Sequence, residues 1–504
     1  MREAAYLLSP EIGLAALAIL VLALDLSLGR KSYVTWVAIV GLLVPLAFVF
    51  ILWGEVVGWW GLISDQGEGT AAIVLPRVFE TLVVDRFALF FKFLIISSLV
   101  LVFLISDWYS DKFSDRRGEY FSLMLISSIG MTLVASSTEM ITLYVALELA
   151  TLPLVALVAF LGGVRSTEAS LKYLILSAVS SGVLLYGMVL LFAFVGTTNL
   201  ETMGTQIQSL GPFDEIGLGM PVLIVGSILM VAGFGFKIAA APFHMWIPDV
   251  YEGAPTTVTA YLSVASKAAG FAVLLRVFLS VFENVDMNWV MLFSILAVVS
   301  MTSGNLLAIV QNNIKRMLAY STIAHAGYII IGLAAVASGS TEAAIVGSAA
   351  LLLYLVAYAF TNLGAFFIVM LISEHVRGET LDKFTGIAKQ APWLAVGLTL
   401  CLVSLTGIPP LAGFMGKLFV FGAGIHADLT WLVAVGVVNS VVSAYYYLRL
   451  VRIMFREGEG GSNLRLSNTS SKLAVGITCG GTILIGVWPQ PVLAIATGIF
   501  ETMF

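Results

Sequence analysis

The sequence predicts an all-α polytopic membrane protein, and three observations lead to this prediction. Hydrophobic residues fill 60% of the 504 positions and charged residues only 11%, whereas soluble domains carry about 25% charged residues. The mean hydropathy is +1.02. Apolar runs of roughly 20 residues, long enough to cross a bilayer as a helix, recur along the whole chain. We therefore expect a lipid bilayer around the chain and no nucleic acid partner.

Fourteen apolar segments have the length of a transmembrane helix. They cover residues 8–29, 33–53, 86–106, 119–137, 139–163, 169–196, 221–247, 255–282, 287–309, 314–338, 342–373, 392–424, 427–455 and 472–500. The first segment is a full-length span and is followed by Arg30 and Lys31. We therefore expect a retained helix there and not a cleaved signal peptide.

The basic residues predict the orientation, because cytoplasmic loops of membrane proteins are enriched in lysine and arginine. Every other loop, with its helix ends, carries basic residues: Arg30, Lys31, Lys112, Arg116, Arg117, Arg165, Lys172, Lys315, Arg316, Arg377, Lys383, Lys389, Arg449, Arg452, Arg456, Arg465 and Lys472. The other side holds Arg2, Arg77 and Arg86, and we expect Lys92 and Arg276 to snorkel there from helix ends. This asymmetry predicts an integral protein of the bacterial inner (cytoplasmic) membrane with both termini outside the cytoplasm.

Four ionisable residues remain well inside the spans: Glu148, Lys237, Lys267 and Lys417. Each charge costs about 2.5–3.5 kcal/mol at the centre of a membrane helix, so the four cost on the order of 10 kcal/mol. Structural ion pairs between helices are one interpretation. One glutamate cannot neutralise three lysines, however. Burial lowers the pKa of a lysine and a nearby carboxylate raises it, so we favour a row of groups that exchange protons.

Two spans contain breaks beside these lysines. Helix 7 is interrupted by "APFHMWIP" and helix 12 by "TGIPPLAGF", and proline both removes a helix donor and clashes with the preceding turn. Freed backbone groups are tolerated at membrane depth only where they are buried in protein or face water. Lys237 stands five residues before Pro242, and Lys417 stands seven residues after Pro410. Each broken helix therefore carries one lysine near its break, in reversed order.

The order of these features predicts an inverted repeat. Helices 4–8 and 9–13 are two sets of five, and the broken helix is the fourth in each set. Because five is odd, the second set begins on the opposite side of the membrane, as in many secondary transporters. Lys267, in helix 8, lies where the sets meet. We expect an N-terminal three-helix region (1–118), a first repeat (119–282), a second repeat (287–455) and a C-terminal loop with helix 14 (456–504).

Two histidines are weaker candidates for the same pathway. His244 lies within the first break, and His325 lies in helix 10 near Ser321 and Tyr328, which offer hydrogen bonds. A lone histidine on an apolar helix is more often a core residue than a proton carrier, so both stay secondary. Topology alone explains Lys315 and Arg316. The two cysteines lie in apolar runs, and the sequence has no nucleotide-binding motif, so we expect no cofactor or metal in this chain.

Several segments of the sequence resemble subunit N, an antiporter-like subunit of respiratory complex I, the proton-translocating NADH:quinone oxidoreductase. They are "EASLKYLILSAVSSGVLLYG", "FKIAAAPFHMWIPDVYEGAPTTVTAYLSVASKAAGF", "GNLLAIVQNNIKRMLAYSTIAHAGYIIIGL" and "SLTGIPPLAGFMGKLFVF". The resemblance runs from about residue 80 to 455, and "PDVYEGAPT" favours subunit N over its sister subunits L and M. A lysine at position 417 is also unlike subunit M, and subunit L has a longer C-terminus.

The resemblance implies roles for the buried residues. Glu148 would be the partner of Lys237, Lys267 the central relay, and Lys417 the terminal lysine of the second half-channel. Proton translocation would be driven by quinone reduction elsewhere in the complex. NADH, FMN, iron–sulfur clusters and quinone would bind partner subunits, and the membrane partners would include subunit M and small membrane subunits. The N-terminal 80 residues match nothing specific.

Two alternatives remain open at this point. One is a subunit of a multi-subunit sodium/proton antiporter, in which no redox chemistry takes place. The other is a structural membrane scaffold, in which replacement of Lys267 by methionine is tolerated. The identity of the co-purifying subunits separates the first alternative from complex I.

Overall fold

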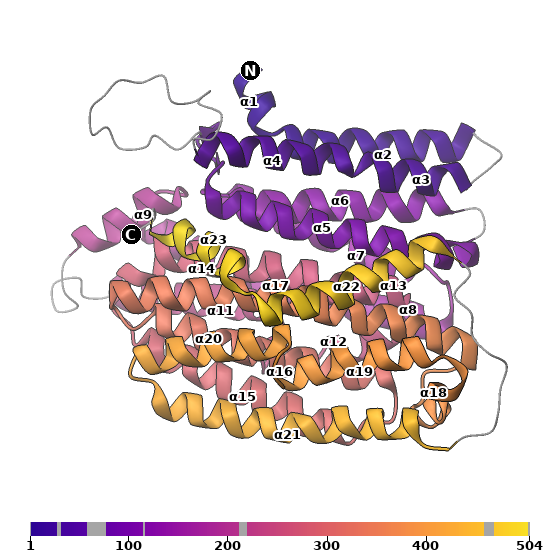
Figure 1. Cartoon of the computed structure of the whole chain (residues 1–504). Coiled ribbons are helices and arrows are strands. Elements are labelled where there is room, and N and C mark those ends of the chain that lie inside the picture. The colour runs from indigo at the N-terminus through magenta and orange to yellow at the C-terminus, as the bar shows by residue number, and fades with distance from the viewer. Residues whose placement is uncertain are drawn as a thin grey trace.

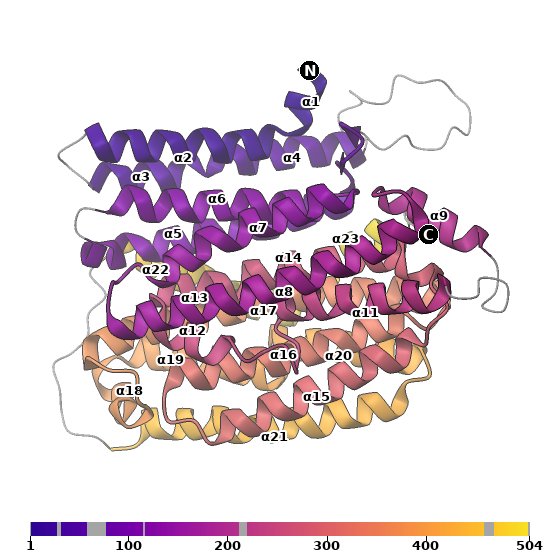
Figure 2. The same cartoon turned by 180° about the vertical axis from the view of Figure 1, so that it is seen from behind.

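The computed structural model describes residues 2–27, 32–57, 77–113, 116–210, 219–457 and 468–501. Nearly all of these residues form one bundle of roughly parallel helices, as Figure 1 and the reverse view in Figure 2 show. A bilayer offers no water to exposed backbone groups, so helices that satisfy their own hydrogen bonds are the expected spanning elements. The all-helical class predicted from the sequence is confirmed.

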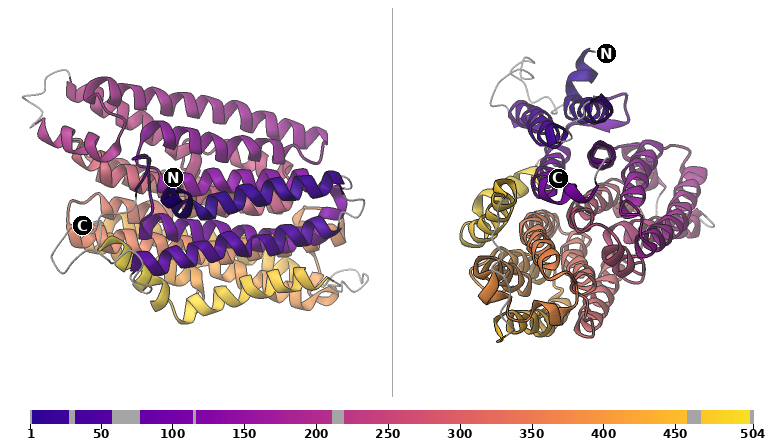
Figure 3. Two further views of the ribbon diagram at one scale, coloured as in Figure 1. Left: turned by 90° about the horizontal axis from the view of Figure 1, so that it is seen from above. Right: turned by 90° about the vertical axis from the view of Figure 1, so that its right-hand side faces the viewer.

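The N-terminal helices lie at one edge of the bundle, where Figure 3 shows them standing beside the main body. They are followed by a small hairpin that the sequence did not predict, with Arg77 paired to Val83. The elements up to the first long body helices are α1 (Arg2–Leu7), α2 (Ser9–Ser27), α3 (Ser32–Gly41), α4 (Leu43–Val57), β1 (Arg77–Val78), β2 (Leu82–Val83), α5 (Arg86–Tyr109), a 3-10 turn (Ser110–Phe113) and α6 (Arg117–Ser136).

The first half of the body continues with α7 (Met140–Val158), α8 (Val164–Val195), α9 (Leu200–Ser209), α11 (Gly219–Ile238), α12 (Ile247–Gly253), α13 (Thr256–Tyr261), one turn of π-helix (Leu262–Ser266), α14 (Lys267–Ser280) and a 3-10 turn (Phe282–Asn284). The turn of π-helix is called the π-turn below. The predicted break in helix 7 is present as the segment between α11 and α12. Predicted helix 8 is interrupted by the π-turn, and α9 is a short helix in a region expected to be a loop. Hydrogen bonds in a π-helix join residues five apart, one residue more than in an α-helix.

The second half of the body consists of α15 (Trp289–Ile309), α16 (Ile314–Val336), α17 (Thr341–Val376), a 3-10 turn (Leu381–Phe384), α18 (Ile387–Gln390), α19 (Pro392–Thr406), α20 (Ala412–His426), α21 (Thr430–Phe455), α22 (Thr469–Val487) and α23 (Gln490–Phe500). Helices α16 and α17 are almost wholly buried and form the centre of the bundle.

Within the described residues, thirteen helices are long and apolar enough to cross a membrane. The remaining expected span, helix 12 at 392–424, is built from α19 and α20, each 15 residues long and separated by the predicted break. The last expected span, 472–500, is also split, because Pro489 separates α22 from α23.

Among the described residues, ion pairs gather several of the predicted basic loops at one end of the bundle, which we call the basic end. Ion pairs there join segments far apart in sequence, among them Lys112 with Glu374 and Lys315 with Glu379. Arg316 binds Asp249 and Glu252. Burial raises the pKa of Asp249, but hydrogen bonds from Lys172 and Arg316 outweigh it, so this pKa is lowered overall. Topology alone was therefore an incomplete explanation of Lys315 and Arg316, because both also fasten α16 to its neighbours.

Candidate functional site

Lys237 lies in the last turn of α11, where the helix stops in mid-bundle. Ala239 takes a positive φ of 67°, and the Ala240 N–H bonds back to the Gly235 carbonyl at 2.9 Å. Pro242 prevents the helix from continuing. The Lys237 side chain is buried, and its Nζ donates a hydrogen bond of 2.8 Å to the Thr151 hydroxyl on α7. The break thus delivers a lysine to the side of a neighbouring helix.

Glu148 lies one turn before Thr151 on the same face of α7, since residues three apart are neighbours on a helix. The carboxylate is half-buried and accepts a hydrogen bond from Ser181 of α8. Among the described residues, Glu148 and Lys237 form no direct ion pair: each binds a hydroxyl instead. The structure therefore brings the two charges to adjacent turns of α7 but holds them apart.

Lys267 is the first residue after the π-turn. Its Nζ donates to the main-chain carbonyl of Thr322 on α16, and it lies 5.7 Å from the centre of the Tyr358 ring on α17. Gly270, one turn further along α14, packs against the end of α11: a Cβ there would lie 2.9 Å from Ile238. Helix α14 thus contacts the end of α11 through Gly270 and α16 through Lys267.

Lys417 lies on α20, just after the second break. Its Nζ donates to the Thr406 carbonyl and to the Ser440 hydroxyl, both at 2.8 Å, and lies 4.5 Å from the Tyr328 ring centre. Thr406 is the last residue of α19, which Gly407 ends with a φ of 92°. The lysine therefore binds a carbonyl that the helix break leaves free.

The two breaks share one electrostatic feature. Lys237 stands at the C-terminus of α11, and the ammonium of Lys417 at the C-terminus of α19. A helix C-terminus carries a partial negative charge of about half an electron, which favours a cation. Neither Lys267 nor Lys417 forms an ion pair with a carboxylate of the described residues. The C-terminal end of α19 and the Ser440 hydroxyl take the place of a counter-ion for Lys417, and a main-chain carbonyl of α16 does so for Lys267.

His325 lies between Lys267 and Lys417 in a cluster of tyrosines. Its Nδ1 is 2.7 Å from the Tyr354 hydroxyl, and its Nε2 is 3.2 Å from the Tyr447 hydroxyl. Thr322 joins this cluster to Lys267, because its hydroxyl lies 3.0 Å from that of Tyr358. The His325 ring also packs against the rings of Tyr328 and Tyr358, which lie beside Lys417 and Lys267 respectively.

His244 behaves differently. It lies in the turn between α11 and α12, and its Nδ1 is buried without a hydrogen-bond partner among the described residues. Within the described residues, no hydrogen bond joins His244 to Glu148 or to the three buried lysines. Of the two secondary candidates, His325 therefore shares a cluster of tyrosines with Lys267 and Lys417, and His244 does not.

Sequence reasoning missed the partners of the four charged residues and of His325. The lysines contact Thr151, Thr322, Ser440, Tyr328 and Tyr358. Glu148 binds Ser181, and His325 binds Tyr354 and Tyr447 in place of the expected Ser321 and Tyr328. One signal was present: Tyr354 and Tyr358 are four residues apart in the apolar run "LLLYLVAYAF" and therefore share a helix face. Two tyrosines on one face of a buried span indicate a polar network.

Two further basic residues contradict the expectation that they snorkel from helix ends. Lys92 is wholly buried on α5 and pairs with Glu11 of α2 at 2.9 Å. Arg276 is buried on α14, forms two hydrogen bonds of 3.0 Å to Asp85, and donates to the Ala135 carbonyl. Both pairs join separate helices and lie outside the row of lysines. Their carboxylate partners are distant in sequence, so the pairs were not visible there.

The second break requires glycine at position 413. A Cβ there would lie 1.9 Å from the Ser404 carbonyl oxygen, far inside van der Waals contact. We expect Gly413→Ala to destabilise the protein by about 1–3 kcal/mol, the usual effect of overpacking, measured as a lower midpoint of thermal unfolding. Gly422→Ala is the matched control on the same helix, because nothing lies within 4 Å of a Cβ there. Equal midpoints for the two variants would contradict this account of the break.

Comparisons with known proteins agree with this geometry. Residues 137–443 match the family described as "NADH:quinone oxidoreductase/Mrp antiporter, TM". The chain is 40% identical to NADH-quinone oxidoreductase subunit N of Dehalococcoides mccartyi over 97% of both chains. A chain of respiratory complex I from Thermus thermophilus is 29% identical, with a TM-score of 0.77, covering 96% of this chain and 98% of that one.

A chain of the Mrp complex from Dietzia is similar in fold, with a TM-score of 0.78, 19% identity, and coverage of 99% of this chain and 97% of that one. Its low identity makes this a likeness of fold alone. The match to the family covers more than half of the chain, and the similarity to subunit N extends over nearly its full length. This chain therefore belongs to the NADH:quinone oxidoreductase/Mrp antiporter family of membrane subunits, as a subunit N.

Proposed function

We propose that this chain is a proton-translocating membrane subunit of an NADH:quinone oxidoreductase. One observation carries the proposal: Glu148, Lys237, Lys267 and Lys417 lie buried or half-buried inside the bundle, and each binds a hydroxyl or a main-chain carbonyl. The relatives named subunit N support the assignment to that complex. Electron transfer takes place elsewhere: NADH, FMN, the iron–sulfur clusters and quinone bind partner subunits, and subunit M and small membrane subunits are neighbours.

The proposed mechanism is electrostatic. When Glu148 and Lys237 approach one another, the lysine holds its proton; when they separate, the proton passes toward Lys267. Unit charges 4 Å apart interact by about 4 kcal/mol at an effective dielectric near 20, and one pKa unit corresponds to about 1.4 kcal/mol. A movement of this size suffices to drive a transfer. The hydroxyl partners, Thr151 and Ser181, stabilise the two groups in the separated arrangement.

The proton then moves from Lys267 through the His325 cluster to Lys417, which releases it at the end of the bundle opposite the basic end. With the basic end in the cytoplasm, both termini lie outside it, and the membrane is the bacterial inner membrane. Residues 119–282 and 287–455 form two inverted halves in this proposal. The opposite directions in which α11 and α19 approach their breaks support it.

The test is Lys237→Ala in the assembled complex, reconstituted into vesicles. We expect proton pumping and the coupled quinone reductase activity to fall severalfold, because alanine offers Glu148 no ammonium group whose proton affinity it could change. Lys389→Ala is the control, since Lys389 is an exposed lysine at the basic end. Normal pumping by a fully assembled Lys237→Ala complex would remove this residue from the pathway.

A sodium/proton antiporter subunit is the second candidate, and the description of the matching family, which names the Mrp antiporter, favours it. Purification of the native complex separates the two. Quinone-reducing subunits that co-purify with this chain support the first proposal, and antiporter subunits alone support the second.

A further inference from the structure

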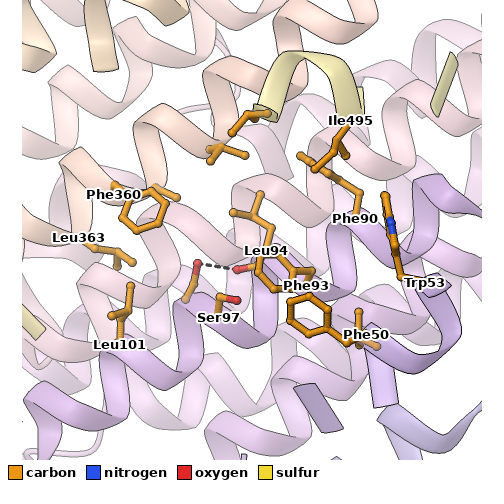
Figure 4. A pocket seen from close by; sticks show the side chains of 15 residues that line it. Phe50, Trp53, Phe90, Phe93, Leu94, Ser97, Leu101, Phe360, Leu363 and Ile495 are labelled. Carbon is orange, nitrogen blue, oxygen red and sulfur yellow. Dashed lines mark hydrogen bonds between the residues drawn. The ribbon is translucent and has the colours of Figure 1, made fainter. Parts of the chain in front are cut away.

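A cavity of about 280 Å³ lies between α4, α5, α17 and α23, outside the row of lysines. Figure 4 shows its lining, which is almost wholly apolar. The labelled side chains are Phe50, Trp53, Phe90, Phe93, Leu94, Ser97, Leu101, Phe360, Leu363 and Ile495. The hydroxyl of Ser98, also in the lining, already donates to the Leu94 carbonyl at 2.7 Å. The cavity therefore suits an apolar ligand.

The cavity opens at the surface of the bundle. Phe50 is 57% exposed and Phe93 is 41% exposed, and their rings meet edge to face with centres 5.5 Å apart. Pro489 turns α23 away from the direction of α22, and α23 has only 11 residues, so it covers the site incompletely. A ligand can thus enter sideways from the surrounding membrane.

The length of the cavity indicates what it holds. Its lining on α5 runs from Phe90 to Leu101, which is about 17 Å at 1.5 Å per residue. Half of the bilayer's hydrocarbon core is about 15 Å. The cavity therefore has the depth of one leaflet, measured from the start of α5. A partner helix about 10 Å wide needs far more volume than the cavity offers.

A cationic group stands at the end of the cavity nearest the start of α5. Arg86 lies one turn before Phe90, and its Nη1 donates to the Gly498 carbonyl at 3.3 Å, one turn after Ile495. Arg86 is half-exposed, and its remaining N–H groups have no hydrogen-bond partner within the described residues. A guanidinium with free donors suits a phosphate group.

We propose that this cavity binds one acyl chain of a membrane phospholipid whose phosphate contacts Arg86. The site needs the chain in the cavity and the phosphate at its mouth in the same leaflet, and the length of the cavity and the place of Arg86 satisfy both. The bound lipid fills the space between the N-terminal helices and α23, and so fastens α4 to the body of the bundle.

The test uses the assembled complex in vesicles containing a phospholipid with a photoreactive diazirine in one acyl chain. The complex is extracted, washed in detergent to remove loosely held lipid, irradiated and digested. We expect labelled peptides from α5, within residues 90–101, at least fivefold above those from the exposed face of α8. Equal labelling of α5 and α8, or recovery of isoprenoid quinone in place of phospholipid from the washed complex, would overturn the proposal.

Two variants, each with a matched control, sharpen the test. Ser97→Trp fills the cavity and should reduce labelling of α5 at least fivefold, whereas Val189→Trp, on the exposed face of α8, should leave it unchanged. Arg86→Gln should reduce retention of the labelled phospholipid, while Arg77→Gln, which removes a cation bound to Glu201 at the same end, should not. Unreduced labelling in assembled Ser97→Trp complex contradicts an acyl chain in this cavity. The labelling of the unaltered complex decides the question if Ser97→Trp fails to assemble.

Discussion

Replacement of Lys267 by methionine is expected to reduce proton pumping by the assembled complex at least about tenfold, because positioned proton-transfer groups contribute that much or more to rate. Methionine fills a similar space but carries no proton. The effect should exceed that of Lys237→Ala, since Lys267 on α14, in the first half, binds Thr322 of α16, in the second half. Pumping is measured as acidification of vesicles that contain the complex, at matched quinone reductase turnover.

The same experiment separates the proton pathway from the alternative of a structural membrane scaffold. A purely structural Lys267 predicts full coupled activity in the methionine variant, whereas the proton pathway predicts its loss with assembly intact. Lys267→Arg is a second test variant: arginine keeps the charge and the hydrogen-bond donors but holds its proton too tightly to release it. We expect it to assemble normally and to pump poorly. Normal pumping by the methionine variant would remove Lys267 from the pathway.

Replacement of Glu11 by alanine is expected to destabilise the protein by about 3–5 kcal/mol, the usual effect of leaving one member of a buried ion pair without its partner. Lys92 is wholly buried, and its Nζ has no other partner among the described residues. The loss should separate α2 from α5 and appear as less assembled complex and a lower midpoint of thermal inactivation.

A neutral double variant provides the control. Glu11→Gln with Lys92→Met removes both charges and keeps the side-chain volumes, so stability should return close to that of the parent. Proton pumping should also stay normal, because this pair lies outside the row from Glu148 to Lys417. A pumping defect in the stable double variant would show that Lys92 is a fourth lysine of the pathway.

The sequence predicted the helical class, the two breaks and the four charged residues for one physical reason. A proline or a charge inside an apolar span is costly, and such residues are therefore informative without any knowledge of their neighbours. Lys417 shows this well, because its burial and the nearby break were both expected from "TGIPPLAGFMGK". The break itself also explains why one long expected span consists of α19 and α20.

The hydrogen-bond and ion-pair partners of these residues were harder to predict, because they depend on packing between segments that are distant in sequence. Thr151 lies 86 residues from Lys237, and Tyr447 lies 122 residues from His325. Lys92 was assigned to a helix end because Glu11, 81 residues earlier, gave no sign of being its partner. The direct pair between Glu148 and Lys237 remains a prediction about another arrangement of the chain, since here each binds a hydroxyl.

The π-turn before Lys267 determines the direction in which this side chain leaves its helix. An α-helix turns by about 100° per residue, so removal of a single residue between Leu262 and Ser266 would rotate Lys267 by roughly that angle. The ammonium would then point away from Thr322 and toward a different neighbour. Chain length in this stretch is consequently as specific as residue type: a deletion there disconnects the lysine without replacing it.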